Sequence, residues 1–101
     1  MTGPPPWPCP EARLLNESEP PPPGTHAWLY EGTLERFTGP PARFPIRQRV
    51  AWPEPVAWER VRALGEWMVT RLSVNGHLLV GLRARAEEEP PSAAKLVVPE
   101  G

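Results

Sequence analysis

Few residues in this chain could carry out acid–base, nucleophilic or metal chemistry. The 101-residue sequence has no Asp, a single cysteine (Cys9) and two histidines (His26 and His77). Without Asp a Ser-His-Asp triad is excluded, and Cys9 lies among prolines, far along the chain from either histidine. These residues do not have the spacing of a zinc site, and there is no glycine-rich phosphate loop. We therefore expect no catalytic residue, no metal and no cofactor, and predict that the protein is not an enzyme.

Arginine provides most of the positive charge, and it is concentrated in the middle of the chain. Residues 25–86 carry nine arginines and five glutamates, a net charge of +4, whereas residues 1–24 and 87–101 carry net charges of −2 and −3. The formal net charge of −1 therefore conceals a basic centre between acidic ends. This asymmetry suggests a surface that binds an anionic partner.

Proline divides the chain in the same way. Nine of the 17 prolines lie in residues 1–24 and three in residues 87–101. Proline lacks the N–H that helix interiors and sheet ladders need. We therefore predict a proline-rich, flexible arm over residues 1–24, a folded domain over residues 25–88 and an acidic, flexible tail over residues 89–101. The apolar residues 96–98 of this tail could form a small docking patch.

The single cysteine and the lack of a secretory apolar stretch at the N-terminus indicate a cytoplasmic location. No segment is long and apolar enough to cross a membrane, so we expect no membrane partner.

Two central segments have the period of two that is typical of half-buried strands. Residues 26–37 place Trp28, Tyr30, Gly32 and Leu34 on one face, and Gly32 predicts a bulge or bend. Residues 43–52 turn four apolar side chains inward (Phe44, Ile46, Val50 and Trp52) and three arginines outward (Arg43, Arg47 and Arg49).

Residues 56–69 fit both a helix and a strand. A helix would have Ala57, Val61, Leu64, Met68 and Leu72 on one stripe. Two features favour a strand: Gly65 costs roughly 1 kcal/mol inside a helix relative to Ala, and Asn75-Gly76 is typical of a type I′ hairpin turn. We therefore predict two long strands joined at Asn75-Gly76, after a short helix near residues 56–60. The alternative is a helix in a ββαββ arrangement.

The strand and glycine pattern of residues 25–88 resembles that of small single-domain OB-fold proteins, such as those in single-strand-binding and telomere-capping complexes. The quoted motifs are the glycine-interrupted strand "YEGTLERF", then "RVRALGEW", then a hairpin into "HLLVGLRARAEE". The resemblance implies an all-β, five-stranded barrel with a short helix. The open alternative is the α+β, ββαββ fold.

The resemblance also implies where a ligand would bind, because OB folds hold ligands across strands 2 and 3 and the neighbouring loops. It implicates Arg43, Arg47 and Arg49 on the second strand, and Arg71 and His77 near the last hairpin, as contacts for phosphates. Trp67 is a candidate for stacking on a base, although Trp28, Tyr30, Phe44 and Trp52 fall on faces assigned to the core.

Two functions follow as hypotheses. The first is a non-enzymatic module that binds single-stranded DNA or RNA through its arginine-lined face. The second is a structural or adaptor subunit that uses the same domain to bind another protein.

Overall fold

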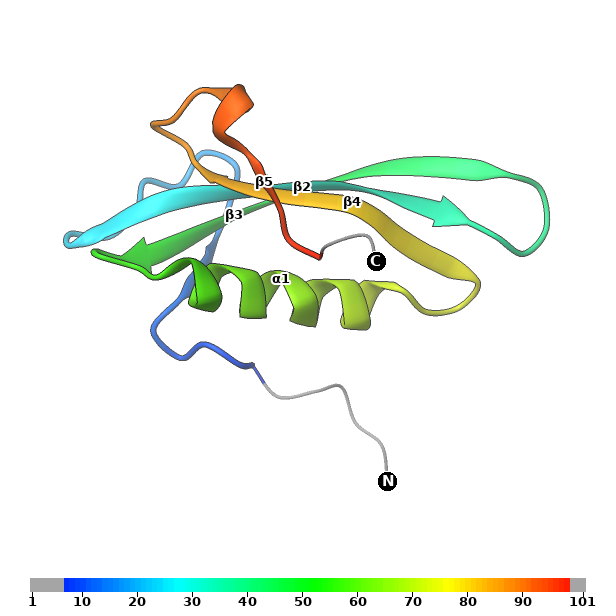
Figure 1. Ribbon diagram of the computed structural model, residues 1–101, viewed down its shortest axis with the longest axis horizontal. Helices are drawn as coiled ribbons and strands as arrows, with labels where there is room; N and C mark the ends of the chain where they lie inside the picture. Colours follow the sequence, from blue (N-terminus) through cyan, green and yellow to red (C-terminus); the bar gives the residue numbers. More distant parts are fainter. Residues whose placement is uncertain (1–6, 99–101) are drawn as a thin grey trace.

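The computed structural model describes residues 7–98 and consists of one antiparallel sheet with a helix on one face (Figure 1). In chain order the elements are β1 (Arg13–Leu15), β2 (Thr25–Arg36), β3 (Ala42–Pro53), α1 (Trp58–Leu72), β4 (His77–Ala86), a 3-10 turn (Pro91–Ala93) and β5 (Lys95–Leu96). The five strands lie in the order β1-β3-β2-β4-β5. The sheet is open, so the predicted closed barrel is wrong, and the structure agrees with the α+β alternative.

The hairpin of β2 and β3 follows the predicted alternation with one exception: Phe44, which was predicted to be in the core, lies near the end of the sheet and is 41% exposed. The two strands pair from Thr25 opposite Pro53 to Arg36 opposite Ala42. Tyr30 and Trp52 are fully buried on the face that α1 covers, which we call the helix-side face. The register of β2 against β4 shifts next to Gly32, between Glu31 and Thr33, which confirms the bulge.

The segment for which a strand was predicted is the helix α1. Its buried residues are Val61, Leu64, Gly65 and Met68, which follow the helical stripe of the sequence. Gly65 has a packing role that the sequence did not reveal. A Cβ at this position would overlap the Cγ atoms of Val97, so only glycine leaves room for the chain after β5 to pack against α1. This contact offsets the low helix propensity of glycine.

The Asn75-Gly76 turn has the predicted local geometry but joins different elements. Asn75 and Gly76 have φ angles of 57° and 79°, and the N–H of His77 donates to the Val74 carbonyl at 3.1 Å. Positive φ at both central residues is the mark of a type I′ turn. Here the turn connects α1 to β4. The turn was therefore predicted correctly, but the strand that was predicted to precede it is a helix.

Both terminal segments contribute to the fold, in contrast to the flexible ends that we expected. β1 pairs with residues 49–51 of β3, and Cys9 and Ala12 are buried in the core. At the other end β5 pairs with β4, and the N–H of Val97 donates to the Leu82 carbonyl at 2.8 Å. Residues from both ends therefore join those of the central segment in one core. The outermost parts of the predicted arm and tail, residues 1–6 and 99–101, lie outside the described residues.

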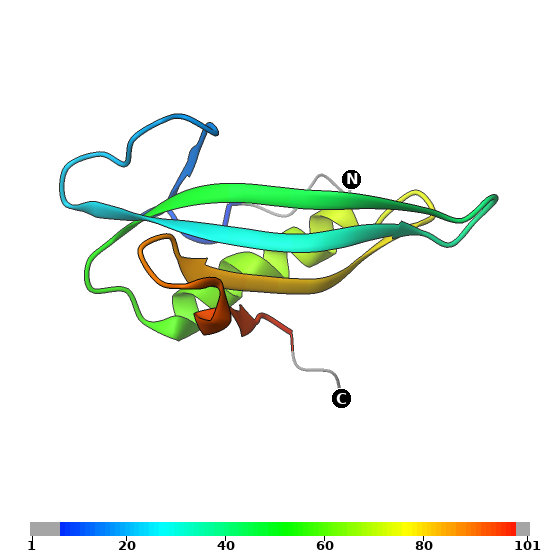
Figure 2. The same ribbon diagram turned by 90° about the horizontal axis from the view of Figure 1, so that it is seen from above.

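The helix covers the sheet unevenly. Seen from above, α1 crosses obliquely beneath β4 and β2 and leaves much of β3 without a helix over it (Figure 2). Its main strand contacts are with β4. No α-helix of the described residues lies over the other face of the sheet, which we call the outer face (Figure 1). Within residues 7–98 no helix is long and apolar enough to span a bilayer.

Candidate binding surfaces

The predicted site residues do not form one continuous track. Arg43, Arg47 and Arg49 alternate along β3 and lie on the outer face, as predicted. Trp67 and Arg71 belong to α1, on the opposite side of the sheet. A single ligand strand lying across the outer face would therefore not reach Trp67 or Arg71.

Arg49 is committed to holding the fold together. Its side chain is only 13% exposed, and its Nε donates to Glu87 at 2.6 Å. The same guanidinium donates to the Asn16 and Glu19 carbonyls at 2.8 and 2.6 Å. The hydrogen bond to Glu87 raises the pKa of Arg49. These contacts tie the loops after β1 and β4 to the sheet and leave few donors for a ligand.

Arg43 and Arg47 are open to solvent. The Arg43 side chain is 77% exposed, with Glu35 at 3.7 Å as its nearest acidic partner. Arg47 is exposed and lies opposite Glu31 in the register of β2 and β3. Surface pairs at such distances contribute little to stability. These two arginines are the predicted residues on the outer face that remain available for binding.

Two arginines that the sequence analysis did not select share this face. Arg83 and Arg85 of β4 lie opposite Glu31 and Leu29 of β2. Arg85 donates to three carbonyls of its own loop, at 2.9 to 3.3 Å, so its role is structural. Arg83 is exposed. The alternation of small or apolar residues with arginine in "GLRARA" would have predicted that Arg83 and Arg85 share one face of a strand.

His77 lies at the start of β4, at the end of the sheet where β2 turns into β3. Its Nδ1 is 3.1 Å from the Asn75 carbonyl, and its ring lies 6.0 Å from that of Phe44. It is therefore near Arg43 along the sheet but on the helix-side face.

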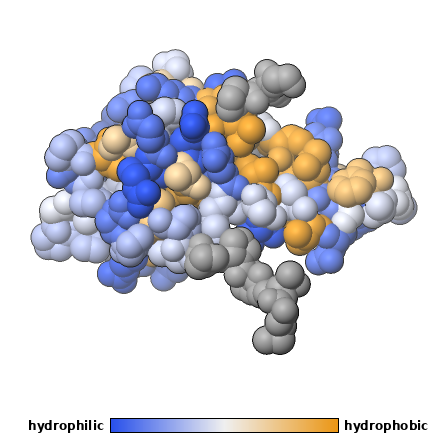
Figure 3. Space-filling model, turned by 60° about the horizontal axis from the view of Figure 1, so that its bottom comes forward, coloured by the Kyte–Doolittle hydropathy of each residue, from blue (hydrophilic) through white to orange (hydrophobic). Residues whose placement is uncertain are grey.

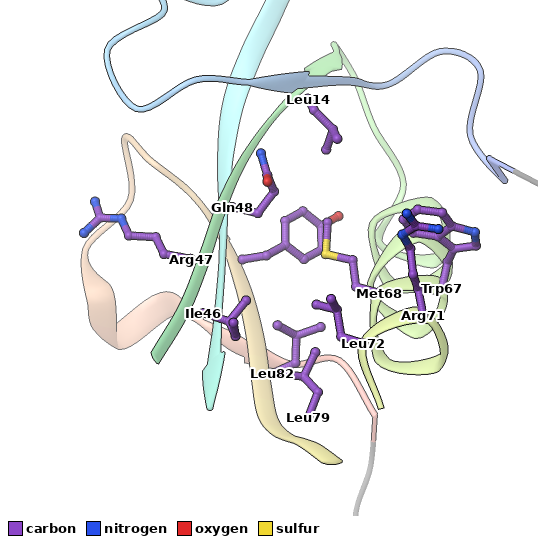
Figure 4. A pocket seen from close by; sticks show the side chains of 11 residues that line it. Leu14, Ile46, Arg47, Gln48, Trp67, Met68, Arg71, Leu72, Leu79 and Leu82 are labelled. Carbon is purple, nitrogen blue, oxygen red and sulfur yellow. The ribbon is translucent and has the colours of Figure 1, made fainter. Parts of the chain in front are cut away.

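The helix-side face has an open apolar cavity of about 280 Å³ between α1, β3 and β1. Figure 4 shows its lining: side chains of α1 form one wall, β2 and β4 the floor, and Leu14 of β1 lies above. Arg71 lies at the rim, and Arg47 points away from the cavity (Figure 4). The apolar lining consists of Leu14, Tyr30, Ile46, Trp67, Met68, Leu72, Leu79 and Leu82.

The polar side chains of Tyr30 and Gln48 next to this cavity already make hydrogen bonds within the protein. The Tyr30 hydroxyl donates to the Val61 carbonyl at 2.8 Å and accepts from the Trp52 indole at 3.2 Å. Burial raises the pKa of Tyr30, which keeps the phenol neutral. The Gln48 amide donates to the Leu15 and Arg49 carbonyls. A ligand in the cavity would therefore be held by apolar contact and by Arg71.

Trp67 and Arg71 form an ordered wall of the cavity. The Arg71 guanidinium lies over the Trp67 ring, 5.5 Å from its centre, and the Trp7 ring meets Trp67 edge-on at 5.2 Å. A cation held over an aromatic face is restrained in orientation. The positive charge of Arg71 thus lies at the cavity mouth (Figure 4).

The residues that could do chemistry are dispersed. Cys9 is buried against the Arg60 carbonyl, and burial raises the pKa of its thiol, which disfavours the reactive thiolate. His26 bridges Glu54 and Glu88 at 2.9 and 2.7 Å. Within residues 7–98 no three metal-ligating side chains are grouped to hold an ion.

Comparison of the chain with protein-family models, with curated proteins and with solved structures gave no match.

Proposed function

We propose that this protein is a non-enzymatic adaptor module whose helix-side cavity binds an acidic, amphipathic helix of a partner protein. The observation that supports this most is the cavity itself. It is open, mostly apolar and bounded by an arginine. Such hydrophobic grooves bind amphipathic helices through apolar side chains three and four residues apart.

The shape of the sheet edge favours a helix over an added strand. β1 pairs only with residues 49–51, so no strand of the described part of the chain pairs with residues 42–48 of β3 on that side. Pro45 lies in the middle of this open edge and has no N–H to donate, which weakens pairing with an extended peptide. The cavity beside the edge would instead receive side chains.

The chemistry of the rim specifies acidic residues in the partner. Arg71 is exposed in the last turn of α1. A partner carboxylate next to its apolar side chains would pair with this guanidinium, which Trp67 already holds in place. A basic helix of the same shape would meet like charge there.

The test is calorimetric titration of the protein with a synthetic helical peptide that carries Leu at positions i, i+3, i+4 and i+7 and Glu on the flanking positions. We expect binding that falls at least about tenfold in Leu14→Glu, because a charge then enters the apolar cavity. Arg71→Glu should weaken binding of the Glu peptide and strengthen binding of a peptide in which Lys replaces Glu. Leu78→Glu is the matched control, since Leu14 and Leu78 are 46% and 48% exposed. Equal binding of a scrambled peptide would refute the proposal.

Nucleic-acid binding is a second candidate, supported by the open outer face with its exposed arginines Arg43, Arg47 and Arg83. No tryptophan or tyrosine lies on that face to stack on bases, because Trp28, Tyr30 and Trp52 pack in or against the core. Binding would therefore depend on phosphate contacts and on salt. The test is a titration of fluorescent single strands at several salt concentrations. Each lost arginine should flatten the salt slope by about 0.7, and no binding at low salt would exclude this candidate.

A further inference from the structure

The end of the sheet where β2 turns into β3 exposes a group of large apolar side chains, which we call the apolar tip: Phe37, Phe44, Val74 and Leu78. Phe37 is 68% exposed, Val74 50% and Leu78 48%. Figure 3 shows apolar surface extending toward this end of the molecule, on the right, whereas the left half is mostly hydrophilic. None of these four side chains lines the helix-side cavity.

The tip is a firm projection made by two neighbouring loops. The N–H of Phe37 donates to the Gly76 carbonyl at 2.9 Å, and Gly76 packs tightly against Thr38. Pro40 and Pro41 restrict the loop between β2 and β3. The apolar side chains are therefore carried on a supported end of the sheet, and little conformational entropy is lost when they are covered.

Charge is distributed unequally between the two ends of the sheet. The tip end carries Arg36 and Arg43, with Glu35 as the nearby acid. The Arg36 guanidinium lies 5.9 Å from the centre of the Phe44 ring, so charge and apolar surface are adjacent. The opposite end carries the acidic residues of the loops after β1, β3 and β4: Glu17, Glu19, Glu54, Glu87, Glu88 and Glu89.

We propose that the apolar tip inserts into the surface of an anionic lipid membrane, independently of the helix-side cavity. Aliphatic and aromatic side chains on a convex tip fit the boundary between headgroups and acyl chains, while the flanking arginines pair with anionic lipids. The acidic end would then point away from the membrane. Nucleic acid fits the tip less well, because only Phe37 and Phe44 offer rings for stacking, whereas Val74 and Leu78 offer none. Our expectation of no membrane partner rested on the lack of a spanning segment, and surface insertion needs none.

The test is co-sedimentation of the full chain with vesicles of phosphatidylcholine and phosphatidylserine in equal parts, compared with vesicles of phosphatidylcholine alone. We expect binding to the mixed vesicles. Phe37→Ala should lower the partition coefficient about tenfold, because the buried ring is lost. Arg43→Gln should lower it about fivefold, and high salt should remove this difference. Both side chains are exposed, so the variants should fold, which thermal melts can verify.

Two further results decide the proposal. Leu14→Glu changes a leucine of similar exposure on the helix-side face and should leave vesicle binding unchanged. If it lowered vesicle binding as much as Phe37→Ala does, the tip would not be the contact. Failure of the unmodified chain to sediment with the mixed vesicles would overturn the proposal, as would unchanged binding in Phe37→Glu.

Discussion

Replacing Gly65 by alanine should destabilise this protein, although the same change usually stabilises a helix. Alanine in place of glycine contributes about 1 kcal/mol in a helix interior. Here the new methyl would overlap the side chain of Val97, which is fully buried against α1. Displacing Val97 would lose about 2 kcal/mol of burial. The net expectation is a loss of about 1 kcal/mol, or a melting temperature lower by about 4–8 °C.

A double-mutant cycle separates this cause from others. Val97→Ala alone should cost about 2 kcal/mol, since it empties the space beside Gly65. In that background the Cγ atoms are absent, so Gly65→Ala should become neutral or stabilising. The assay is urea denaturation of the four proteins. If Gly65→Ala stabilised the unmodified chain by about 1 kcal/mol, Val97 would not pack on α1, and the argument for this contact would fail.

Three other predictions concern the contacts that hold the sheet and its loops. Gly76→Ala should lower the melting temperature more than Gly39→Ala, because both glycines have φ near 80° but only Gly76 also packs against Thr38. Equal decreases in the melting temperature would show that the contact with Thr38 is unimportant. Hydrogen bonding to Glu88, and then the charge of Glu54, raises the pKa of His26 above its unfolded value. The contacts of His26 with these two residues should therefore stabilise the fold below about pH 6.5 and weaken as the pH rises through the folded pKa. His26→Gln should remove that pH dependence from the melting temperature. Arg49→Met should cost about 1–3 kcal/mol in urea denaturation because it leaves Glu87 and loop carbonyls without their donor, whereas Arg43→Met should change stability by less than about 0.5 kcal/mol.

The central hairpin could be predicted from sequence because its signal is local. Alternation along residues 26–37 and 43–52 identified both strands, their buried faces and the outward arginines, and Gly32 identified the bulge. The helix was missed for a reason that lies outside its own segment. The cost of Gly65 argued against a helix, and the compensating contact comes from Val97, more than thirty residues later in the chain.

The candidate surfaces were predicted less well than the strands. The outward direction of Arg43, Arg47 and Arg49 was correct, but nothing in the local pattern indicates that Arg49 is occupied by loop carbonyls from residues 16–19. Trp67 and Arg71 were assigned to the same track as the β3 arginines because residues 61–69 were expected to be a strand. Once that segment is a helix, the sheet separates the two groups, and the cavity between α1 and β3 appears instead.

The burial of Val97 also constrains the order in which the chain can fold during synthesis. Val97 is fully buried in the same core as Cys9 and Ala12, so this core joins residues from near both ends of the described chain. Contacts between residues so distant in sequence form slowly, because long loops must close first. A nascent chain that has emerged only as far as β4 lacks Val97, so the space beside Gly65 would not yet be filled. The core can therefore close fully only once residue 97 is available, and until then the partly emerged chain would expose apolar surface of the kind that favours aggregation.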